Sequence, residues 1–254
     1  MTVLSRVATA LAATILAGIL GTVAHGANPN ALWEIVHDRC VPGAKSGNPA
    51  PCIRVGPDDA VLKDIVGHTQ FLLIPTARIT GIEDPALLAS GVPNYFGHAW
   101  QARNDVEARA GHPLPRSAIA LAINPPGNRS QNQLHIHVDC IRPDVRNALR
   151  QVAVGPTWAL LPEPLEGQHY TAMRLKGDTL DQDPVRLLAD GIQGARGAME
   201  DYTLVVAGVE APAGFILLAG RIGLDGPGHG EDLQDHDCGI ANEATPPAQE
   251  DRRP

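Results

Sequence analysis

Residues 131–140, QNQLHIHVDC, place two histidines and an aspartate at alternate positions: His135, His137 and Asp139. Because successive side chains of a β-strand point to opposite faces, these three would share one face. The residues between them would face the core, and they are Leu134, Ile136, Val138 and Cys140. Such a strand could be a solvated surface, a metal site or the floor of a site with a histidine nucleophile. Several amide side chains nearby favour a functional site.

A histidine nucleophile suits phosphorus chemistry. Imidazole attacks phosphorus and forms a labile phosphoramidate, which divides one difficult displacement into two easier ones. The attacking nitrogen must be neutral, and an acceptor must hold the other ring nitrogen. Donors are also needed around the phosphate oxygens, where negative charge gathers. The candidates in the loop before the motif, and after an earlier apolar strand, are Asn124, Arg129, Gln131, Asn132 and Arg78. This mechanism needs no metal and no other cofactor.

Zinc is the alternative chemistry for the same residues. HIHVDC differs by one residue from the H-x-H-x-D-H motif of metallo-β-lactamase-type hydrolases, which have a histidine where this chain has Cys140. In an extended strand Cys140 would face away from the histidines, and no close CxxC pair is present. A zinc hydrolase using His135, His137 and Asp139 stays open as an alternative. So does a non-catalytic nucleotide- or lipid-binding protein.

The elements that would position these residues follow from periodicity, caps and turn residues. Apolar runs predict strands at residues 70–79, 117–123, 133–141, 169–175, 202–209 and 214–221. Helices are expected near residues 30–40, 85–90, 94–111, 143–152 and 183–200. We expect Asn30 and Asn94 to cap the first and third of these helices, and Gly111 to end the third.

Strands and helices are mixed without regular alternation, which favours an α+β fold with an antiparallel sheet flanked by helices. No linker or repeat divides the chain. We therefore expect a single catalytic domain over residues 28–242, whose sheet the strand-rich second half could extend.

The first 27 residues have the order of an export signal. One cation, Arg6, precedes an uncharged run at residues 7–23, and small residues follow. This order predicts a signal peptide or an N-terminal membrane anchor. At the other end, residues 243–254 are expected to be a disordered tail. The net charge of −8 and the lack of a Lys/Arg run argue against a nucleic-acid partner.

The four cysteines agree with export, because an even number in an oxidising compartment favours disulfides. Cys40 and Cys52 flank a turn-rich stretch, so we pair them, which leaves Cys140 with Cys238. The sequence leaves the other two pairings open. A bond from Cys140 to Cys238 would draw the C-terminal segment to the motif, although we do not expect His236 to join the site.

Several longer stretches resemble one family. They are FLLIPTARITGIEDPALL, PNYFGHAWQAR, INPPGNRSQNQLHIHVDCIRPDVR, the Cys-bearing segment around IVHDRCVPG, and QDHDC near the C-terminus. Together they resemble the CDP-diacylglycerol pyrophosphatases, bacterial inner-membrane enzymes of the histidine-triad-like superfamily. The resemblance implies a histidine-triad-like fold and hydrolysis of CDP-diacylglycerol to CMP and phosphatidate. It also implies anchoring in the inner membrane with the catalytic domain on the periplasmic side. From the sequence we infer no obligatory protein partner.

The resemblance assigns roles to the motif residues. In the superfamily pattern H-φ-H-φ-H-φ-φ, the first histidine falls on His135 and the second, the nucleophile, on His137. The third position holds Asp139, where the superfamily has a histidine that assists the leaving group. Asn124 and Gln131 match positions that hold phosphates. We expect Asp139 to fix an imidazole or to position water.

Overall fold

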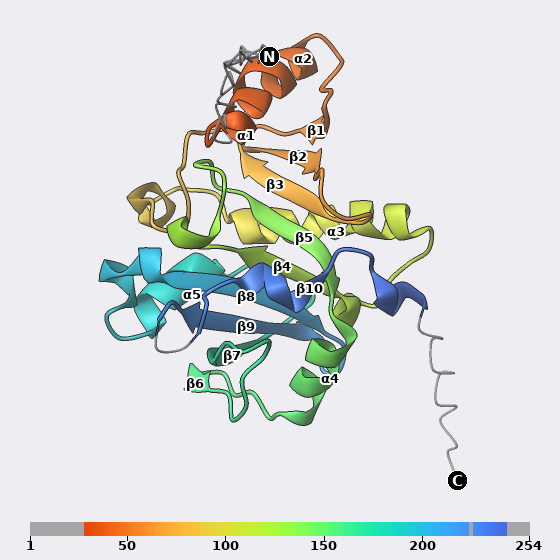
Figure 1. The fold of residues 1–254 in the computed structure, drawn as a ribbon. Coiled ribbons are helices and arrows are strands. Elements are labelled where there is room, and N and C mark those ends of the chain that lie inside the picture. Colours follow the sequence, from red (N-terminus) through yellow and green to blue (C-terminus); the bar gives the residue numbers. More distant parts are fainter. Residues whose placement is uncertain (1–27, 224–225, 243–254) are drawn as a thin grey trace, which may run out of the picture.

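The computed structural model describes residues 28–223 and 226–242 (Figure 1). The predicted export segment and the predicted disordered tail lie outside these residues. Within the described ranges, none of the helices has the length and apolarity needed to cross a membrane.

One antiparallel sheet organises the described chain. Its strands are β1 (Cys52–Val55), β2 (Asp59–Lys63), β3 (Phe71–Pro75), β4 (Ile119–Ile123), β5 (Ile136–Ile141), β6 (Ala159–Leu160), β7 (Tyr170–Lys176), β8 (Tyr202–Val209), β9 (Gly214–Arg221) and β10 (Gln234–Asp235). The order is β1-β2-β3-β5-β4-β8-β9-β7-β6, and the short β10 pairs with β5. The pairings of β5 with β3, β4 and β10 are all antiparallel. The predicted α+β class with an antiparallel sheet is confirmed, and the second half does extend the sheet through β8.

Helices are few and mostly short. The α-helices are α1 (Ala31–Glu34), α2 (Val41–Lys45), α3 (Tyr95–Ala110), α4 (Pro143–Gln151) and α5 (Pro184–Gly191). A π-helical segment, η1 (Ile35–Cys40), joins α1 to α2. The 3₁₀ turns are η2 (Pro85–Leu88), η3 (Arg116–Ala118), η4 (Pro126–Asn128), η5 (Ala195–Gly197), η6 (Met199–Asp201), η7 (Gly230–Leu233) and η8 (Gly239–Asn242).

Three helix expectations can be compared directly with the structure. The Asn94 side chain accepts from the Gly97 N–H at the start of α3, and Gly111 ends that helix with a φ of 84°, as predicted. The single helix expected at 183–200 is wrong, because α5 ends at Gly191 and only 3₁₀ turns follow. The Asn30 cap is also wrong, since its side chain accepts from Arg78 instead of from the helix.

The two faces of the sheet have different coverings. One core cluster contains Ile136 and Val138 of β5 together with Phe96 and Trp100 of α3, so α3 covers this face. In Figure 1, α3 lies behind β3 and β5, whereas the C-terminal segment with β10 crosses in front. A smaller cluster on the opposite face joins Leu32 and Val36 of the first helical segment to β2 and β3. The front face of β5 is therefore flanked by the N-terminal helices on one side and the C-terminal segment on the other.

Both expected disulfides are present. Cys40–Cys52 ties η1 to β1, and Cys140–Cys238 ties β5 to the C-terminal segment. The second bond fixes two segments that lie far apart in the sequence, and it determines what covers the motif strand.

Candidate active site

His137 and Asp139 lie on the front face of β5, and His135 comes directly before the strand and lines the same cavity as His137. His137 is opposite Leu72 on β3 and Ala122 on β4, and Asp139 is opposite Ala120. Directly opposed residues of an antiparallel pair share a face, so the small side chains of β4 leave room above the strand. The motif side chains are not solvated: 8% of His135, 6% of His137 and none of Asp139 is exposed.

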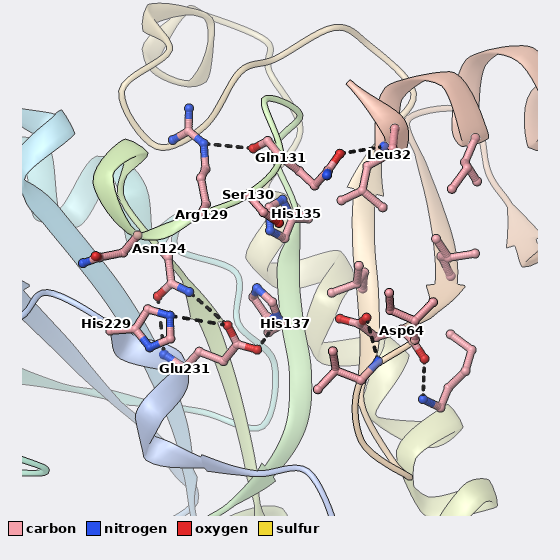
Figure 2. Close-up of a pocket in the computed structure, with 18 residues that line it drawn as sticks. Leu32, Asp64, Asn124, Arg129, Ser130, Gln131, His135, His137, His229 and Glu231 are labelled. Atoms are coloured by element: carbon pink, nitrogen blue, oxygen red, sulfur yellow. Dashed lines mark hydrogen bonds and ion pairs between the residues drawn. The ribbon is translucent and has the colours of Figure 1, made fainter. Parts of the chain in front are cut away.

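A cavity of about 450 Å³ opens above this strand (Figure 2). Its floor carries His135 and His137. A polar wall is formed by Asn124, Asn128, Arg129, Ser130, Gln131, His229 and Glu231. The opposite side is mostly apolar, with Ala31, Leu32, Ile35, Leu62, Ile65, Val66 and Leu72 beside Lys63 and Asp64. Figure 2 shows the histidines between Glu231 and His229 on one side and Leu32 and Asp64 on the other.

His137 has one ring nitrogen engaged by the protein. Its Nδ1 lies 3.2 Å from Glu231 Oε1 and 2.9 Å from Gln70 Nε2. When Nδ1 is unprotonated it accepts from Gln70 Nε2, and when Nδ1 carries the proton its nearest acceptor is Glu231 Oε1. Gln70 Nε2 also donates to Glu231 Oε1 at 2.9 Å. Within the described chain, no residue hydrogen-bonds to Nε2. The Nδ1–H tautomer therefore leaves the Nε2 lone pair available to a ligand in the cavity.

Both motif histidines are held neutral. Burial lowers the pKa of His137 well below that of a free histidine, and the neighbouring imidazoles add to this effect. Burial also lowers the pKa of His135, although its Nδ1 donates to the Gln133 carbonyl at 2.7 Å. The two rings stand edge to face with centroids 5.0 Å apart. At neutral pH the floor of the cavity thus presents unprotonated imidazole, the form that a nucleophile requires.

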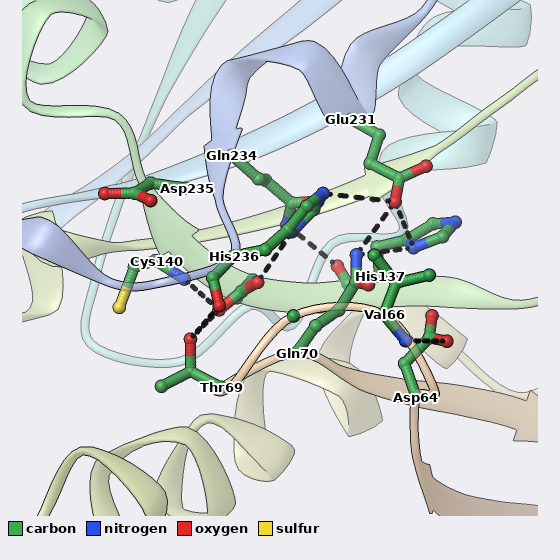
Figure 3. A network of polar contacts seen from close by, with 12 residues as sticks. Asp64, Val66, Thr69, Gln70, His137, Cys140, Glu231, Gln234, Asp235 and His236 are labelled. Atoms are coloured by element: carbon green, nitrogen blue, oxygen red, sulfur yellow. Dashed lines mark hydrogen bonds and ion pairs between the residues drawn. The ribbon is translucent and has the colours of Figure 1, made fainter.

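Glu231 joins the polar side chains into one network (Figure 3). Its Oε2 accepts from Asn124 Nδ2 at 3.1 Å and lies 3.9 Å from His229 Nε2. Its Oε1 lies 3.2 Å from His137 Nδ1 and 3.5 Å from His236 Nε2. The backbone around Glu231 sits close to the sheet, because the Gly230 N–H donates to Thr203 Oγ1 on β8. The carboxylate thus lies within ion-pair distance of three imidazoles.

Asp139 turns toward the C-terminal segment. Its Oδ1 accepts from Thr69 Oγ1 at 2.6 Å and from the Cys140 N–H at 2.8 Å, and its Oδ2 lies 2.9 Å from His236 Nδ1. The expectation that His236 stays out of the site is wrong, because the Cys140–Cys238 bond and the pairing of β10 with β5 bring it there. Asp139 does fix an imidazole, and that imidazole is His236. The hydrogen bond to Asp139 raises the pKa of His236.

His229 is the third imidazole at Glu231. Its Nδ1 lies 2.6 Å from Asp232 Oδ1, which leaves Nε2 directed at Glu231. The side chain is about one-third exposed, at 34%, and it lines the same cavity as His137. His229 is therefore an accessible imidazole with one nitrogen fixed by a carboxylate.

The predicted phosphate-binding residues divide into two groups. Asn124, Arg129 and Gln131 line the cavity. Arg129, however, forms a two-point ion pair with Glu83. The Gln131 side chain accepts from the Leu32 N–H and donates to the Asn28 carbonyl.

The structure does not bring the other two predicted ligands, Arg78 and Asn132, to the cavity. Arg78 donates to Asn30 and lies over the Trp33 ring. The Asn132 N–H donates to the Pro29 carbonyl. Arg78 instead connects the start of the first helical segment to the loop after β3, and Asn132 connects Pro29 to the loop before β5.

The zinc alternative required His135, His137 and Asp139 around one ion. Asp139 is instead engaged by Thr69 and His236, and His135 Nδ1 by a backbone carbonyl. In the ranges that the structure covers, no three His, Cys, Asp or Glu side chains are arranged to hold a metal ion. The geometry therefore gives this alternative no support.

Comparison with known protein families decides the identity. The family model described as CDP-diacylglycerol pyrophosphatase matches residues 27–242, which is most of the chain. The chain belongs to the CDP-diacylglycerol pyrophosphatase family. It is an enzyme, a hydrolase that acts on the diphosphate bond of CDP-diacylglycerol, and the resemblance noted in the sequence is confirmed.

Two residues at the centre of this pyrophosphatase's site were missed by the sequence analysis. Glu231 lies in the segment GHGEDLQDHDC, and Gln70 comes just before β3. The available signal for Glu231 was the disulfide itself, since a bond between Cys140 and Cys238 places the acidic residues before Cys238 near the motif. Gln70 carried no signal beyond its position at the start of a predicted strand.

Proposed function

We propose that the enzyme hydrolyses CDP-diacylglycerol to CMP and phosphatidate through a covalent intermediate on His137. The observation that carries this proposal is the contact of 3.2 Å between His137 Nδ1 and Glu231 Oε1 in the floor of the cavity. It supplies the acceptor that a nucleophilic imidazole needs on its second nitrogen.

In the first step, His137 Nε2 attacks the phosphorus next to cytidine. The N–P bond forms while the bond from this phosphorus to the bridging oxygen breaks, and phosphatidate departs with the electron pair. The ring gains positive charge as the bond forms, and the Glu231 carboxylate at Nδ1 stabilises that charge. Asn124 Nδ2, which lies in the cavity wall, is a donor for the phosphate oxygens.

In the second step, water attacks the same phosphorus and the N–P bond breaks. The electron pair returns to Nε2, the water gives its proton to the imidazole that assisted the departing phosphatidate, and CMP leaves. The two displacements are chemically alike, so one set of donors serves both. The solvent oxygen ends in CMP, whereas attack on the other phosphorus would place it in phosphatidate.

Assistance to the departing phosphatidate is assigned to His229. The third position of the superfamily pattern holds Asp139, which lies under His236 and not on the cavity wall. His229 lines the cavity, and Asp232 accepts from its Nδ1, so in the doubly protonated ring Nε2 is the nitrogen that donates to the leaving oxygen. His135 orients the site, because its Nδ1 is already committed to the Gln133 carbonyl.

The proposal includes a histidine-triad-like fold for the half of the sheet around β5. This fold is supported by the position of the motif on a central strand, after a loop that contains Gly and Gln. It also includes anchoring in the bacterial inner membrane with the catalytic domain on the periplasmic side. The uncharged run at residues 7–23 and the two disulfides support this location.

The test is chemical rescue of His137→Gly. This variant should lose turnover of CDP-diacylglycerol but hydrolyse cytidine 5′-phosphorimidazolide, which carries the missing imidazole already bonded to phosphorus. His112→Gly, at an exposed histidine outside the cavity, is the matched control and should keep normal turnover. Normal activity of His137→Gly toward CDP-diacylglycerol would contradict the assignment, with thermal unfolding used to verify the fold of each variant.

A further inference from the structure

The cavity is amphipathic, with its polar and apolar parts on different elements. Its polar wall is built by the loop before β5 and by η7. The apolar side is built by Leu32 and Ile35 of the first helical segment and by Leu62 and Leu72 of the neighbouring strands. This division matches a ligand with a charged head and an apolar body. A cavity of about 450 Å³ has the size of a small-molecule site. It can take a nucleoside diphosphate head, so two long acyl chains must remain outside it.

An exposed apolar loop, residues 64–67, borders the apolar side of the cavity. Ile65 is 99% exposed and Val66 is 51% exposed, and both line the cavity edge. The loop is anchored in spite of this exposure. The Val66 N–H donates to Asp64 Oδ1 at 3.1 Å, and Lys63 Nζ donates to the Asp64 and Gly67 carbonyls at 2.7 and 3.0 Å. These bonds hold two large apolar side chains in solvent at the mouth of the site.

The base of this loop contacts the catalytic network. The His68 N–H donates to the His236 carbonyl at 2.8 Å. A Cβ added to Gly67, whose φ is +67°, would lie 2.4 Å from His236 Cβ, so the backbone approaches that residue closely. Figure 3 shows Asp64 and Val66 beside Gln70 and His137. The position of Ile65 and Val66 is thus fixed relative to His137.

The N-terminal end of the described chain lies beside the same cavity. Gln131, in the cavity wall, donates from Nε2 to the Asn28 carbonyl at 3.1 Å. The uncharged apolar run at residues 7–23 ends only a few positions before Asn28. A chain whose apolar N-terminal run enters a bilayer would therefore bring the cavity, and the loop at its mouth, close to the lipid surface.

We propose that residues 64–67 dock on the lipid surface, with Ile65 and Val66 inserted among the acyl chains. The apolar side of the cavity then covers the glycerol end of the substrate while its chains stay in the bilayer. The inference rests on the proposed function, because it takes His137 as the point that the diphosphate must reach. Its new content is the surface that meets the membrane and the route by which the lipid enters.

The first test compares two substrates on the full chain reconstituted in vesicles. The double variant Ile65→Asp/Val66→Asp should lower kcat/KM for long-chain CDP-diacylglycerol in the vesicles about tenfold or more, because two apolar side chains lose their burial in lipid. It should lower kcat/KM for monomeric dihexanoyl CDP-diacylglycerol in solution far less, because that substrate does not have to be taken from a bilayer. Leu160→Asp is the matched control, since Leu160 is 66% exposed on β6 at the opposite edge of the sheet.

Two outcomes of this comparison would contradict docking of the loop on the lipid surface. Equal losses with both substrates would mean that the loop shapes the site, and no loss with either would mean that it does not dock; both overturn the proposal. His137→Ala runs in parallel and should inactivate the enzyme toward both substrates. If His137→Ala stays active, the proposed catalytic function fails, whatever the loop variants show.

The second test reports on insertion directly. A fluorescent label on Ile65→Cys in the reconstituted full chain should be quenched by lipids brominated on their acyl chains, whereas the same label on Leu160→Cys should not. A label at position 65 that is shielded from aqueous iodide but not quenched by brominated lipid would mean that protein covers the loop. The cover would then be residues 7–23 or a second copy, and the lipid surface would be excluded.

Discussion

Asp139 Oδ2 lies 2.9 Å from His236 Nδ1, and the other nitrogen of the same ring lies 3.5 Å from Glu231 Oε1. Glu231 in turn contacts His137 Nδ1. The two carboxylates favour the protonated form of the His236 imidazole, because both of its nitrogens are then donors. The aspartate at the third motif position thus acts on His137 through His236 and Glu231. His236 is a positioning residue that holds the acceptor of the nucleophile.

The first prediction concerns the series of contacts that links Asp139 to His137. The hydrogen bond to Asp139 raises the pKa of His236 and so favours the protonated ring, and activity should fall on the alkaline side as that proton is lost. The acidic limb should lie below pH ~6.5, because burial lowers the pKa of His137. Asp139→Asn should move the alkaline limb to lower pH and leave the acidic limb in place.

The groups that face His236 are Asp139 and Glu231, with Asp64 farther away. The control is Asp144→Asn, since Asp144 pairs with Arg142 on an exposed surface. The measurement is the pH profile of kcat/KM. An unchanged alkaline limb in Asp139→Asn would show that His236 does not control the site.

The second prediction separates the two disulfides. Cys140–Cys238 closes a sequence separation of 98 residues and Cys40–Cys52 one of 12. Removing the first should cost about 4–5 kcal/mol of unfolding free energy and removing the second about 3 kcal/mol. The Cys140→Ala/Cys238→Ala variant should also lose more activity, because it frees the segment that carries His236 and Glu231. Urea unfolding and kcat measured on both double variants check this; equal activity losses would contradict it.

The third prediction concerns the fit of η7 on the sheet. A Cβ at Gly230 would lie 2.3 Å from Thr203 Oγ1 and 2.6 Å from Val205 Cγ2. Gly230→Ala should therefore push Glu231 away from His137 and lower kcat by about a hundredfold if the shift approaches 1 Å. Gly155→Ala is the control, because a Cβ there meets nothing within 4 Å. Steady-state kinetics on both variants decide, and a normal kcat for Gly230→Ala would show that Glu231 tolerates displacement.

The fourth prediction tests the assistance assigned to His229. His229→Gln should lower turnover of CDP-diacylglycerol by about a hundredfold, the lower end of the range for lost acid–base assistance. It should affect the 4-nitrophenyl ester of CMP much less, because nitrophenolate leaves without a proton donor. His112→Gln serves as the histidine control. Equal losses with both substrates would assign His229 to binding and not to the leaving group.

Much of the framework could be predicted from local sequence. The apolar runs over β4, β5, β7, β8 and β9 and the capped helix α3 were all placed, since each has a clear pattern and clear ends. The strands β1 and β2 were missed, because they are short and separated by the turn residues around Pro57. The helix expected at 183–200 ends at Gly191 because Ile192 is extended, and the φ of 81° at Gly194 keeps the helix from resuming.

The site residues also divide into those that a local sequence pattern could predict and those that it could not. His135, His137 and Asp139 come from β5 and the residue directly before it, so alternation alone placed them on one face. Glu231 and His236 come from a segment that reaches β5 only through β10 and a disulfide, and no local pattern marks such an approach. Arg129 was expected as a phosphate ligand, but residue type cannot show that a guanidinium is already paired with Glu83.

The central claim is that His137 becomes covalently bonded to the cytidylyl phosphorus. The most direct measurement is rapid acid-free quenching of the enzyme with CDP-diacylglycerol labelled at the phosphorus next to cytidine, followed by peptide mapping. The account predicts an acid-labile, alkali-stable label on His137 that forms and decays at rates compatible with turnover, and no label in His137→Ala. Turnover without any labelled enzyme at these times, or a label on another residue, would contradict it.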